Sequence, residues 1–132
     1  MLTFTITTSR REEILDLTDR VQDALRQLDA TEGVALVSVP HCTCALYLNE
    51  HEGGLLDDTL TALGLLGRLQ RWRHDVIDDN AAAHLAATLV GNSVLVPVRR
   101  GRLELGTWQR VLLAELDGPR TRQVTVAVLR EA

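Results

Sequence analysis

The sequence is short of aromatic residues, of cysteines and of long apolar segments. Only 3% of its 132 residues are aromatic, so the core has to be built mainly from Leu, Val, Ala and Ile. No apolar segment approaches the length that crosses a membrane, and residues 1–13 lack the basic stretch followed by an apolar core that marks a signal peptide. These absences argue against a membrane protein and a secreted one, and we expect a cytoplasmic protein.

Charge of either sign is moderate and is not concentrated in one segment. The formal net charge is −4, and no dense basic stripe with interleaved aromatic residues occurs, so we expect neither a nucleic-acid partner nor a membrane partner. Apolar residues make up 45% and charged residues 24%, the balance of a globular protein. A chain of this length buries roughly two-thirds of the surface that its unfolded form exposes, and we expect residues 1–132 to form a single domain.

The only cysteines are Cys42 and Cys44. They are badly placed to bond to each other or to clamp one metal ion, and free cysteines often behave as small apolar residues. We expect both to pack in or beside the core.

Apolar periodicity predicts an α+β order of elements. Alternation in residues 2–7, followed by residues 13–17, indicates an opening hairpin, and residues 21–28 repeat at helical spacing after Thr18, a suitable N-cap. The apolar run 34–39 reads as a buried strand that continues through 43–48. The remaining expected elements are a helix opening at Gly53-Gly54 with Asp57 and Asp58 in its first turn, a polar loop over 68–79, a helix over 81–90 capped by Asn80, and strands over 94–98, 103–105, 108–116 and 123–129.

Three histidines, His41, His74 and His84, fall at a strand end, in the polar loop and on a short helix. Neutral imidazoles together with Glu50, Asp57 or Asp58 suit zinc, which takes three or four nitrogen, oxygen or sulfur ligands. No local metal motif fixes their geometry, however, and an isolated histidine is more often a surface or hydrogen-bonded residue. His51 precedes a helix start, and we expect it to be a solvated loop residue.

Two further segments carry polar groups that suit a ligand. Residues 105–109 combine a glycine, a hydroxyl, an indole and an amide, although a tight bend with Trp108 anchoring the core explains them equally well. Arg120 and Arg122 follow the Gly118-Pro119 turn, where a guanidinium group binds phosphate or carboxylate well. Exposed arginines at a turn are nevertheless commoner than such a site.

The strings HCTCALYLNE, WRHDVIDDNAAAHL and LGTWQ, followed by DGPRTR, resemble in that order the motifs of the YjbQ-like family, also called UPF0047. The resemblance implies an α+β fold, a small mostly antiparallel β-sandwich of about seven strands with two to three helices, and a homotrimer. It also implies a divalent metal ion, zinc or magnesium. The implied metal ligands are His41, His74 and His84; the implied catalytic residues are Glu50, Asp58 and His41; and the implied substrate-binding residues are Thr43, Asn49, Asn80, Gly106, Thr107, Trp108, Gln109 and Arg122.

The activity that the resemblance implies is that of a secondary thiamine-phosphate synthase. This transferase joins a pyrimidine diphosphate to a thiazole phosphate and needs a metal ion or a cationic clamp on the diphosphate. Two alternatives use the same residues: a metal-dependent hydrolase of a phosphoester or lactone, and a non-catalytic module that binds a metal or a metabolite. The sequence departs from the family pattern at Cys42 and Cys44, which affects packing, and at Arg99-Arg100, whose purpose we do not assign.

Overall fold

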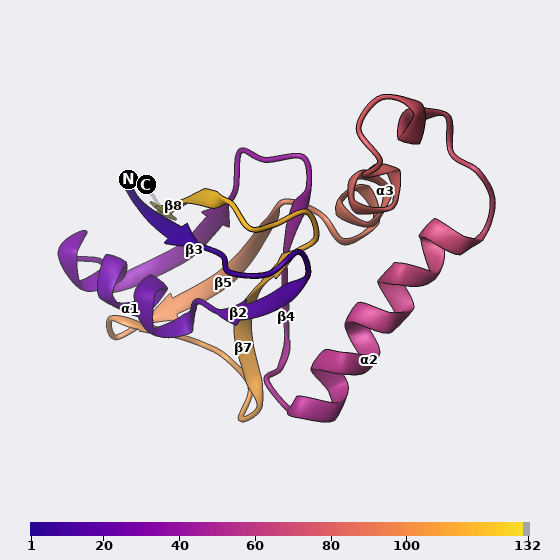
Figure 1. Ribbon diagram of the computed structural model, residues 1–132. Coiled ribbons are helices and arrows are strands. Elements are labelled where there is room, and N and C mark those ends of the chain that lie inside the picture. The colour runs from indigo at the N-terminus through magenta and orange to yellow at the C-terminus, as the bar shows by residue number, and fades with distance from the viewer. Residues whose placement is uncertain (131–132) are drawn as a thin grey trace.

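The computed structural model describes residues 1–130, which form eight strands and three α-helices (Figure 1). All strand pairs are antiparallel, so the expected α+β fold is confirmed. The strands are β1 (Leu2–Thr7), β2 (Glu13–Asp16), β3 (Glu32–Ser38), β4 (Cys44–Glu50), β5 (Ser93–Arg99), β6 (Arg102–Leu103), β7 (Gln109–Glu115) and β8 (Thr121–Leu129). The helices are α1 (Thr18–Gln27), α2 (Gly53–Gly64) and α3 (Ala81–Val90), with short 3-10 helices η1 (Leu65–Arg68) and η2 (Arg73–Val76).

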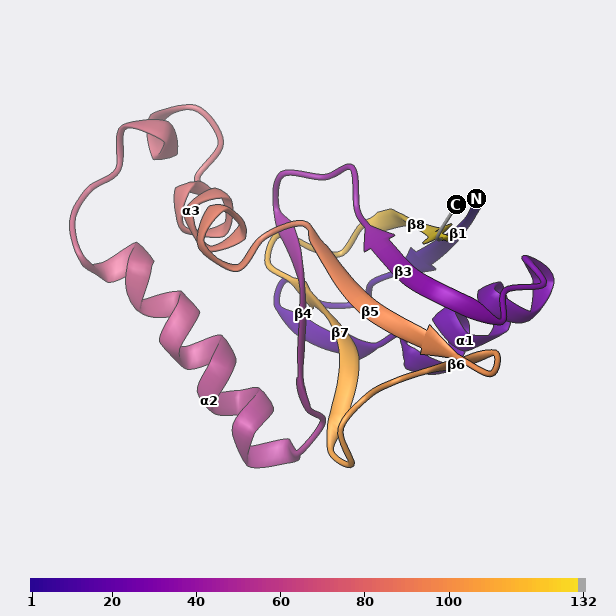
Figure 2. The ribbon, with the colours of Figure 1, turned by 180° about the vertical axis from the view of Figure 1, so that it is seen from behind.

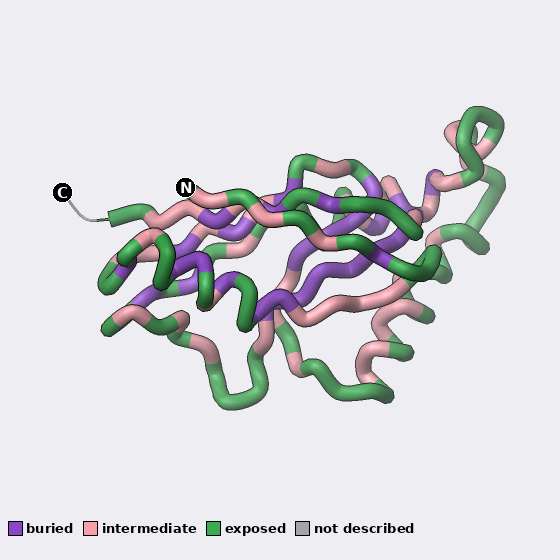
Figure 3. Tube along the Cα trace, turned by 60° about the vertical axis from the view of Figure 1, so that its left-hand side comes forward, coloured by how far each residue is buried: buried purple, intermediate pink, exposed green. Residues whose placement is uncertain are grey.

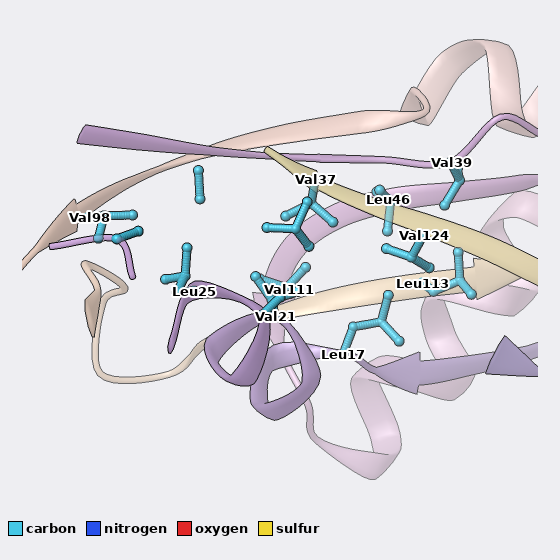
Figure 4. Close-up of a cluster of buried hydrophobic side chains, with 14 of the residues drawn as sticks. Leu17, Val21, Leu25, Val37, Val39, Leu46, Val98, Val111, Leu113 and Val124 are labelled. Carbon is cyan, nitrogen blue, oxygen red and sulfur yellow. The ribbon is translucent and has the colours of Figure 1, made fainter. Parts of the chain in front are cut away.

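Two sheets enclose the main core. One sheet has the order β1-β8-β3-β5-β6 and the other the order β2-β7-β4. Alternate residues of each strand point inward, so Val37, Leu46, Leu113 and Val124 meet between the sheets with less than 2% of each exposed. Helix α1 adds its apolar face, including Val21, to this cluster (Figure 4).

The helices α2 and α3 lie on the other side of the three-stranded sheet. A second apolar cluster joins Ala83 and Ala86 of α3 to Ala114 and Leu116, with leucines of α2 packed at its margin. Helix α2 stands well apart from the sandwich in both ribbon views (Figures 1 and 2), and none of its residues is buried. The purple segments of Figure 3 accordingly concentrate in the sandwich and in part of α3.

Several details of the sequence interpretation were wrong. Residues 2–7 and 13–16 are strands but form no hairpin, because β1 pairs with β8 and β2 pairs with β7 in the other sheet. The region 34–48 is two strands in different sheets rather than one bent strand. Residue Thr18 is the first residue of α1 and not its cap; its hydroxyl accepts the Val111 N–H at 2.8 Å.

The start of α2 also differs in detail. Its first turn holds no acidic residue, so Asp57 and Asp58 follow one turn later and are exposed. The cap is instead Glu52, whose carboxylate accepts the N–H groups of Gly54 and Leu55 at 2.9 and 2.7 Å. Of the cysteines, Cys44 is buried as expected, whereas Cys42 is exposed, and both are free thiols.

Candidate functional site

The loop between β3 and β4 brings His41 against the C-terminal half of α3. His41 and Cys42 line a surface hollow together with His84 and Thr88 of α3 and with residues 91–92 that follow it. We call this the His41 hollow. Two of the three predicted histidines therefore reach one concave surface, although they are 43 positions apart in the sequence.

The third histidine lies directly behind His84. The rings of His74 and His84 meet edge to face, with centroids 4.6 Å apart and planes at 76°. The Nε2 atom of His74 is buried and has no hydrogen-bond partner among the described residues. Its nearest carboxylate, that of Asp78, is 3.8 Å away, which is too long for a hydrogen bond. A buried nitrogen without a partner is costly, and it marks a place where a ligand would be favourable.

The hydrogen bond of His41 fixes its chemical form. Strand β3 ends at Ser38, opposite Thr125, so β8 has no β3 partner at Gln123. The His41 ring fills that place, and its Nε2 accepts the Gln123 N–H at 2.8 Å. A neutral imidazole has one acceptor nitrogen and one donor nitrogen, so His41 carries its proton on Nδ1. In this geometry the Nδ1–H group of His41 is free to donate a hydrogen bond to a ligand. A metal bound to Nε2 would displace the Gln123 N–H, and a metal bound to Nδ1 would move the proton to Nε2, so either mode of coordination breaks the bond to Gln123.

The electrostatic surroundings favour the same neutral form. Burial lowers the pKa of His41, and the nearby Arg122 guanidinium lowers it further, against a smaller opposite effect of Glu115. Protonation would also remove the lone pair that accepts the Gln123 N–H. The ring is therefore held neutral near pH 7.

A buried ion pair lies behind His41. Glu115 on β7 is fully buried and Arg122 on β8 is 3% exposed. The Arg122 Nε donates to Glu115 at 2.9 Å, and its Nη2 donates to the Thr43 hydroxyl at 2.9 Å. Thr8 donates to the same carboxylate at 2.8 Å. The predicted residues Thr43 and Arg122 thus belong to one network with Glu115, which the sequence interpretation missed; its only signal was a single acidic residue within the apolar run 111–116.

Most of the other predicted residues gather at the opposite end of β4. Glu50 pairs with Gln109 in the sheet, and Glu50, Thr107 and Trp108 line a second hollow with Asp16, His51, Glu52 and Arg110. Trp108 is 71% exposed, so it does not anchor the core. The seven residues of β4 separate this hollow from the His41 hollow by about 20 Å. His51, set aside in the sequence interpretation, lines the second hollow.

Residues 106–109 form a tight turn at the start of β7. The side-chain oxygen of Gln109 accepts the Gly106 N–H at 2.8 Å, and the Gln109 N–H is donated to the Gly106 carbonyl at 3.1 Å. Asn49, at the end of β4, accepts the N–H of its neighbour Glu50 at 2.8 Å. These bonds hold the exposed end of the β4–β7 pair in one conformation.

Two more predicted residues, Asp58 and Asn80, line neither of these hollows. Asp58 is exposed on α2. The side-chain amide of Asn80 donates to Asp117 at 2.8 Å, whereas its side-chain Oδ1 is buried without a hydrogen-bond partner in the described part of the chain. Asn80 lines a third hollow beside α2 and α3. Neither residue lines the His41 hollow.

The predicted metal ligands do not form a complete set in the described structure. Within residues 1–130, no three His, Cys, Asp or Glu side chains converge closely enough to hold a metal ion. His74 and His84 supply two imidazoles in contact, and His41 is engaged by Gln123. The metal site stays a prediction. No helix of the described chain is long and apolar enough to cross a membrane.

Known proteins resemble this chain over nearly its whole length. The model of a family described as UPF0047 protein YjbQ-like matches residues 2–131. A UPF0047 protein of Archaeoglobus fulgidus is 51% identical over 126 residues, which cover 95% of this chain and 98% of that protein. The UPF0047 protein YugU of Bacillus subtilis is 35% identical, covering 96% and 97%.

Solved structures extend this similarity to the fold. The crystal structure of a YbjQ-like protein of unknown function from Sulfolobus solfataricus superposes with a TM-score of 0.92 at 43% identity, covering 98% of this chain and 95% of that one. An uncharacterized protein of the same family from Clostridium acetobutylicum gives 0.91 at 30% identity, covering 98% and 100%.

Proposed function

Because the chain belongs to the YjbQ-like family, we propose that it is a metal-dependent enzyme that binds a phosphorylated small molecule in the His41 hollow. The observation that carries this proposal is the Nε2 atom of His74, which is buried and has no hydrogen-bond partner within residues 1–130. The His74 ring packs against His84, and His84 lines that hollow. A hydrogen bond or a coordinate bond from a ligand would satisfy this atom.

The donors around the hollow suit an anionic ligand. His41 presents an Nδ1–H group, because its Nε2 is occupied by Gln123. The positive charge of Arg122 lies behind it and is close enough to affect the pKa of His41. A phosphate oxygen accepts hydrogen bonds, so it complements the Nδ1–H group, whereas Arg122 is already paired with the buried carboxylate of Glu115.

The imidazoles of His74 and His84 favour zinc over magnesium. Magnesium prefers oxygen ligands in octahedral geometry, whereas nitrogen donors suit zinc. We propose that these two histidines, whose rings are in contact, hold the ion. A divalent ion there would neutralise negative charge on a diphosphate group.

For the reaction we propose the transfer that the sequence resemblance implies, in which a thiazole phosphate displaces diphosphate from a pyrimidine diphosphate. We also propose a homotrimer. This assembly is the one that the sequence resemblance implies.

The first test is the metal content of the purified protein, prepared without chelator and reconstituted with zinc. We expect one equivalent of zinc per chain in the wild type and less than a tenth in His74→Ala and His84→Ala. His51→Ala is the matched control, because His51 is an exposed histidine outside the hollow, and it keeps its zinc. Absence of bound metal in the reconstituted wild type refutes the metal site.

The second test is turnover of the pyrimidine diphosphate and thiazole phosphate by the zinc-loaded protein. Formation of the joined phosphate above the metal-only blank, lost in His84→Ala, supports the transferase. Zinc binding without any turnover refutes the proposed reaction and leaves the metal site standing.

A further inference from the structure

The hollow that Asn80 lines is separate from the two hollows at the ends of β4, and we call it the Asn80 hollow. Its floor is apolar and consists of Leu63 on α2, Ala83 and Ala86 on α3, and Leu116 after β7. Its volume is about 170 Å³. An apolar protein cavity of roughly 150 Å³ can take up one benzene molecule, so the Asn80 hollow has room for a ligand of that size.

The shape of this floor is set by packing. Ala83, Ala86 and Leu116 are buried in the second apolar cluster, and Leu63 packs at its margin. At the other wall, Gly64 has no side chain, and an added methyl group there would have no atom within 4 Å. The Asn80 hollow therefore exists before any ligand arrives, as most small-molecule sites do.

The rim of the Asn80 hollow carries more negative than positive charge. Three carboxylates, those of Glu12, Asp75 and Asp79, and one guanidinium group, that of Arg11, line it. Arg11 donates to the backbone carbonyl of Asp79 at 3.0 Å, and one Asp75 oxygen accepts the Ala81 N–H at 2.8 Å. Within residues 1–130, the carboxylates of Glu12 and Asp79 make no hydrogen bond and no ion pair, so both remain available to a cation.

Asn80 contributes a further acceptor that lacks a donor. Its side-chain amide is held by Asp117, while its Oδ1 is buried and has no hydrogen-bond partner in the described chain. A buried acceptor without a donor is costly, and an N–H group from a ligand would satisfy it. An ammonium group has three donors and no acceptor, so it complements a rim that consists mainly of acceptors.

The Asn80 hollow lies on a different side of α3 from the His41 hollow. Residues 82, 83 and 86 line the Asn80 hollow, whereas residues 84, 87 and 88 line the His41 hollow. Since successive residues of a helix are rotated by about 100°, these two sets point to different sides of α3. The two hollows share no lining residue. A ligand in the Asn80 hollow is thus independent of the metal and the reaction proposed above.

We propose that the Asn80 hollow binds a compact organic cation, in which an ammonium group is attached to a single ring or a short apolar chain. The apolar part lies on the floor formed by Ala83, Ala86 and Leu116. The ammonium group faces the carboxylates of Glu12 and Asp79 and the Oδ1 atom of Asn80.

The test is a titration of the ¹⁵N-labelled full chain at pH 7 with benzylamine, which is protonated at this pH, followed in ¹H–¹⁵N correlation spectra. Benzyl alcohol and benzoate are the neutral and anionic probes of the same size. We expect benzylamine to shift the amide signals of residues 79–86 saturably and to bind at least about tenfold more tightly than benzyl alcohol, because its hydrogen bonds are charge-assisted. Benzoate should not bind.

Three variants locate the site. Ala83→Leu fills the floor and should abolish benzylamine binding. Asp79→Asn removes an exposed charge and should weaken binding about threefold. Asp29→Asn is the matched control, because Asp29 is also exposed and has nearly the same backbone φ, 55° against 53° at Asp79, but lies outside the hollow; it should leave binding unchanged.

Each result decides the proposal. Absence of a saturable shift with benzylamine overturns it, and so does binding of benzyl alcohol or benzoate that is equally tight. Binding that survives Ala83→Leu, or that Asp29→Asn weakens as much as Asp79→Asn does, also overturns it. Should Ala83→Leu fail to fold by circular dichroism, Gly64→Leu at the opposite wall is the second filling variant, and it should likewise abolish binding.

Discussion

Replacing His41 distinguishes a hydrogen-bond donor from a metal ligand. In His41→Ala the Gln123 N–H loses the acceptor that it has at 2.8 Å, and a half-buried ring is removed. A lost hydrogen bond costs about 0.5–1.5 kcal/mol, so with the lost packing we expect the free energy of unfolding to fall by about 1–2 kcal/mol. Urea unfolding followed by circular dichroism measures this change.

His41→Gln should recover most of the lost stability. The glutamine oxygen reaches the position of the imidazole Nε2 and accepts the same N–H, while its amide nitrogen remains a donor for an anion. We expect His41→Gln to be within about 0.5 kcal/mol of the wild type. Glutamine is a poor zinc ligand, so this variant separates the two roles that His41 was given.

Metal content then decides between those roles. If His41 is a donor in the Nδ1–H form, His41→Gln keeps its zinc while His84→Ala loses it, and long-range ¹H–¹⁵N correlations of the wild type show the proton of His41 on Nδ1. Loss of zinc in His41→Gln, or a proton on Nε2, would refute our reasoning from the Gln123 bond. A His41→Gln protein as unstable as His41→Ala would show that the bond itself does not form in solution.

Three further predictions concern the network behind His41 and the turn beside it. Glu115→Ala leaves Arg122 as a buried charge without a partner and should cost about 3–5 kcal/mol of unfolding free energy by urea titration, whereas Glu115→Leu combined with Arg122→Met should cost much less. Burial alone raises the pKa of Glu115, but hydrogen bonds, first that from Arg122, outweigh it and hold the pKa below 4.5. The unfolded chain therefore binds the proton more tightly than the folded one. The stability that Glu115 contributes is present above about pH 4.5 and is lost as the pH falls toward the folded-state pKa. The urea midpoint, measured between pH 3 and 6, should therefore depend less on pH in Glu115→Gln than in the wild type. Gly118→Ala drives a methyl group into the Arg10 carbonyl oxygen and should cost about 1–3 kcal/mol by thermal unfolding, whereas Gly53→Ala, with no atom near its added methyl group, should cost nothing.

Most helices and strands were predictable, because the apolar periodicity that indicates each of them lies within a short stretch of sequence. The helix over residues 81–90, the strand at 2–7 and the strands after Ser93 lie within a few residues of their predicted bounds. Partner choice was not predictable in the same way. The hairpin expected at the N-terminus failed because Leu2 pairs with Val126 and Glu13 pairs with Glu115, and such distant pairings leave no signal within a short window.

The candidate site was predictable as residue types and not as geometry. The approach of His74 to His84 was among the expected groupings, and it arises because the polar loop before α3 folds back onto that helix. The split between the His41 hollow and the hollow of Glu50 follows from the length of β4, which residue motifs do not encode. The hydrogen bond from Gln123 to His41 was not predictable, because its donor is a backbone N–H group, which does not depend on the residue type at position 123.

The strand at residues 34–39 shows how a sequence interpretation can be right about chemistry and incomplete about structure. Its unbroken apolar run predicts burial on both faces, yet the described chain buries Ala35 and Val37 and leaves Val34 and Leu36 only partly covered. Neither composition nor propensity explains this, since β1 in the same sheet alternates cleanly. Strands that are apolar on both faces are typical of sheets covered on both sides, so the homotrimer proposed above predicts a partner over this face. The amides of β5 near Leu95 should then exchange with solvent faster in Leu95→Arg than in the wild type, because losing the partner uncovers that strand, and equal exchange rates would show that no partner covers it.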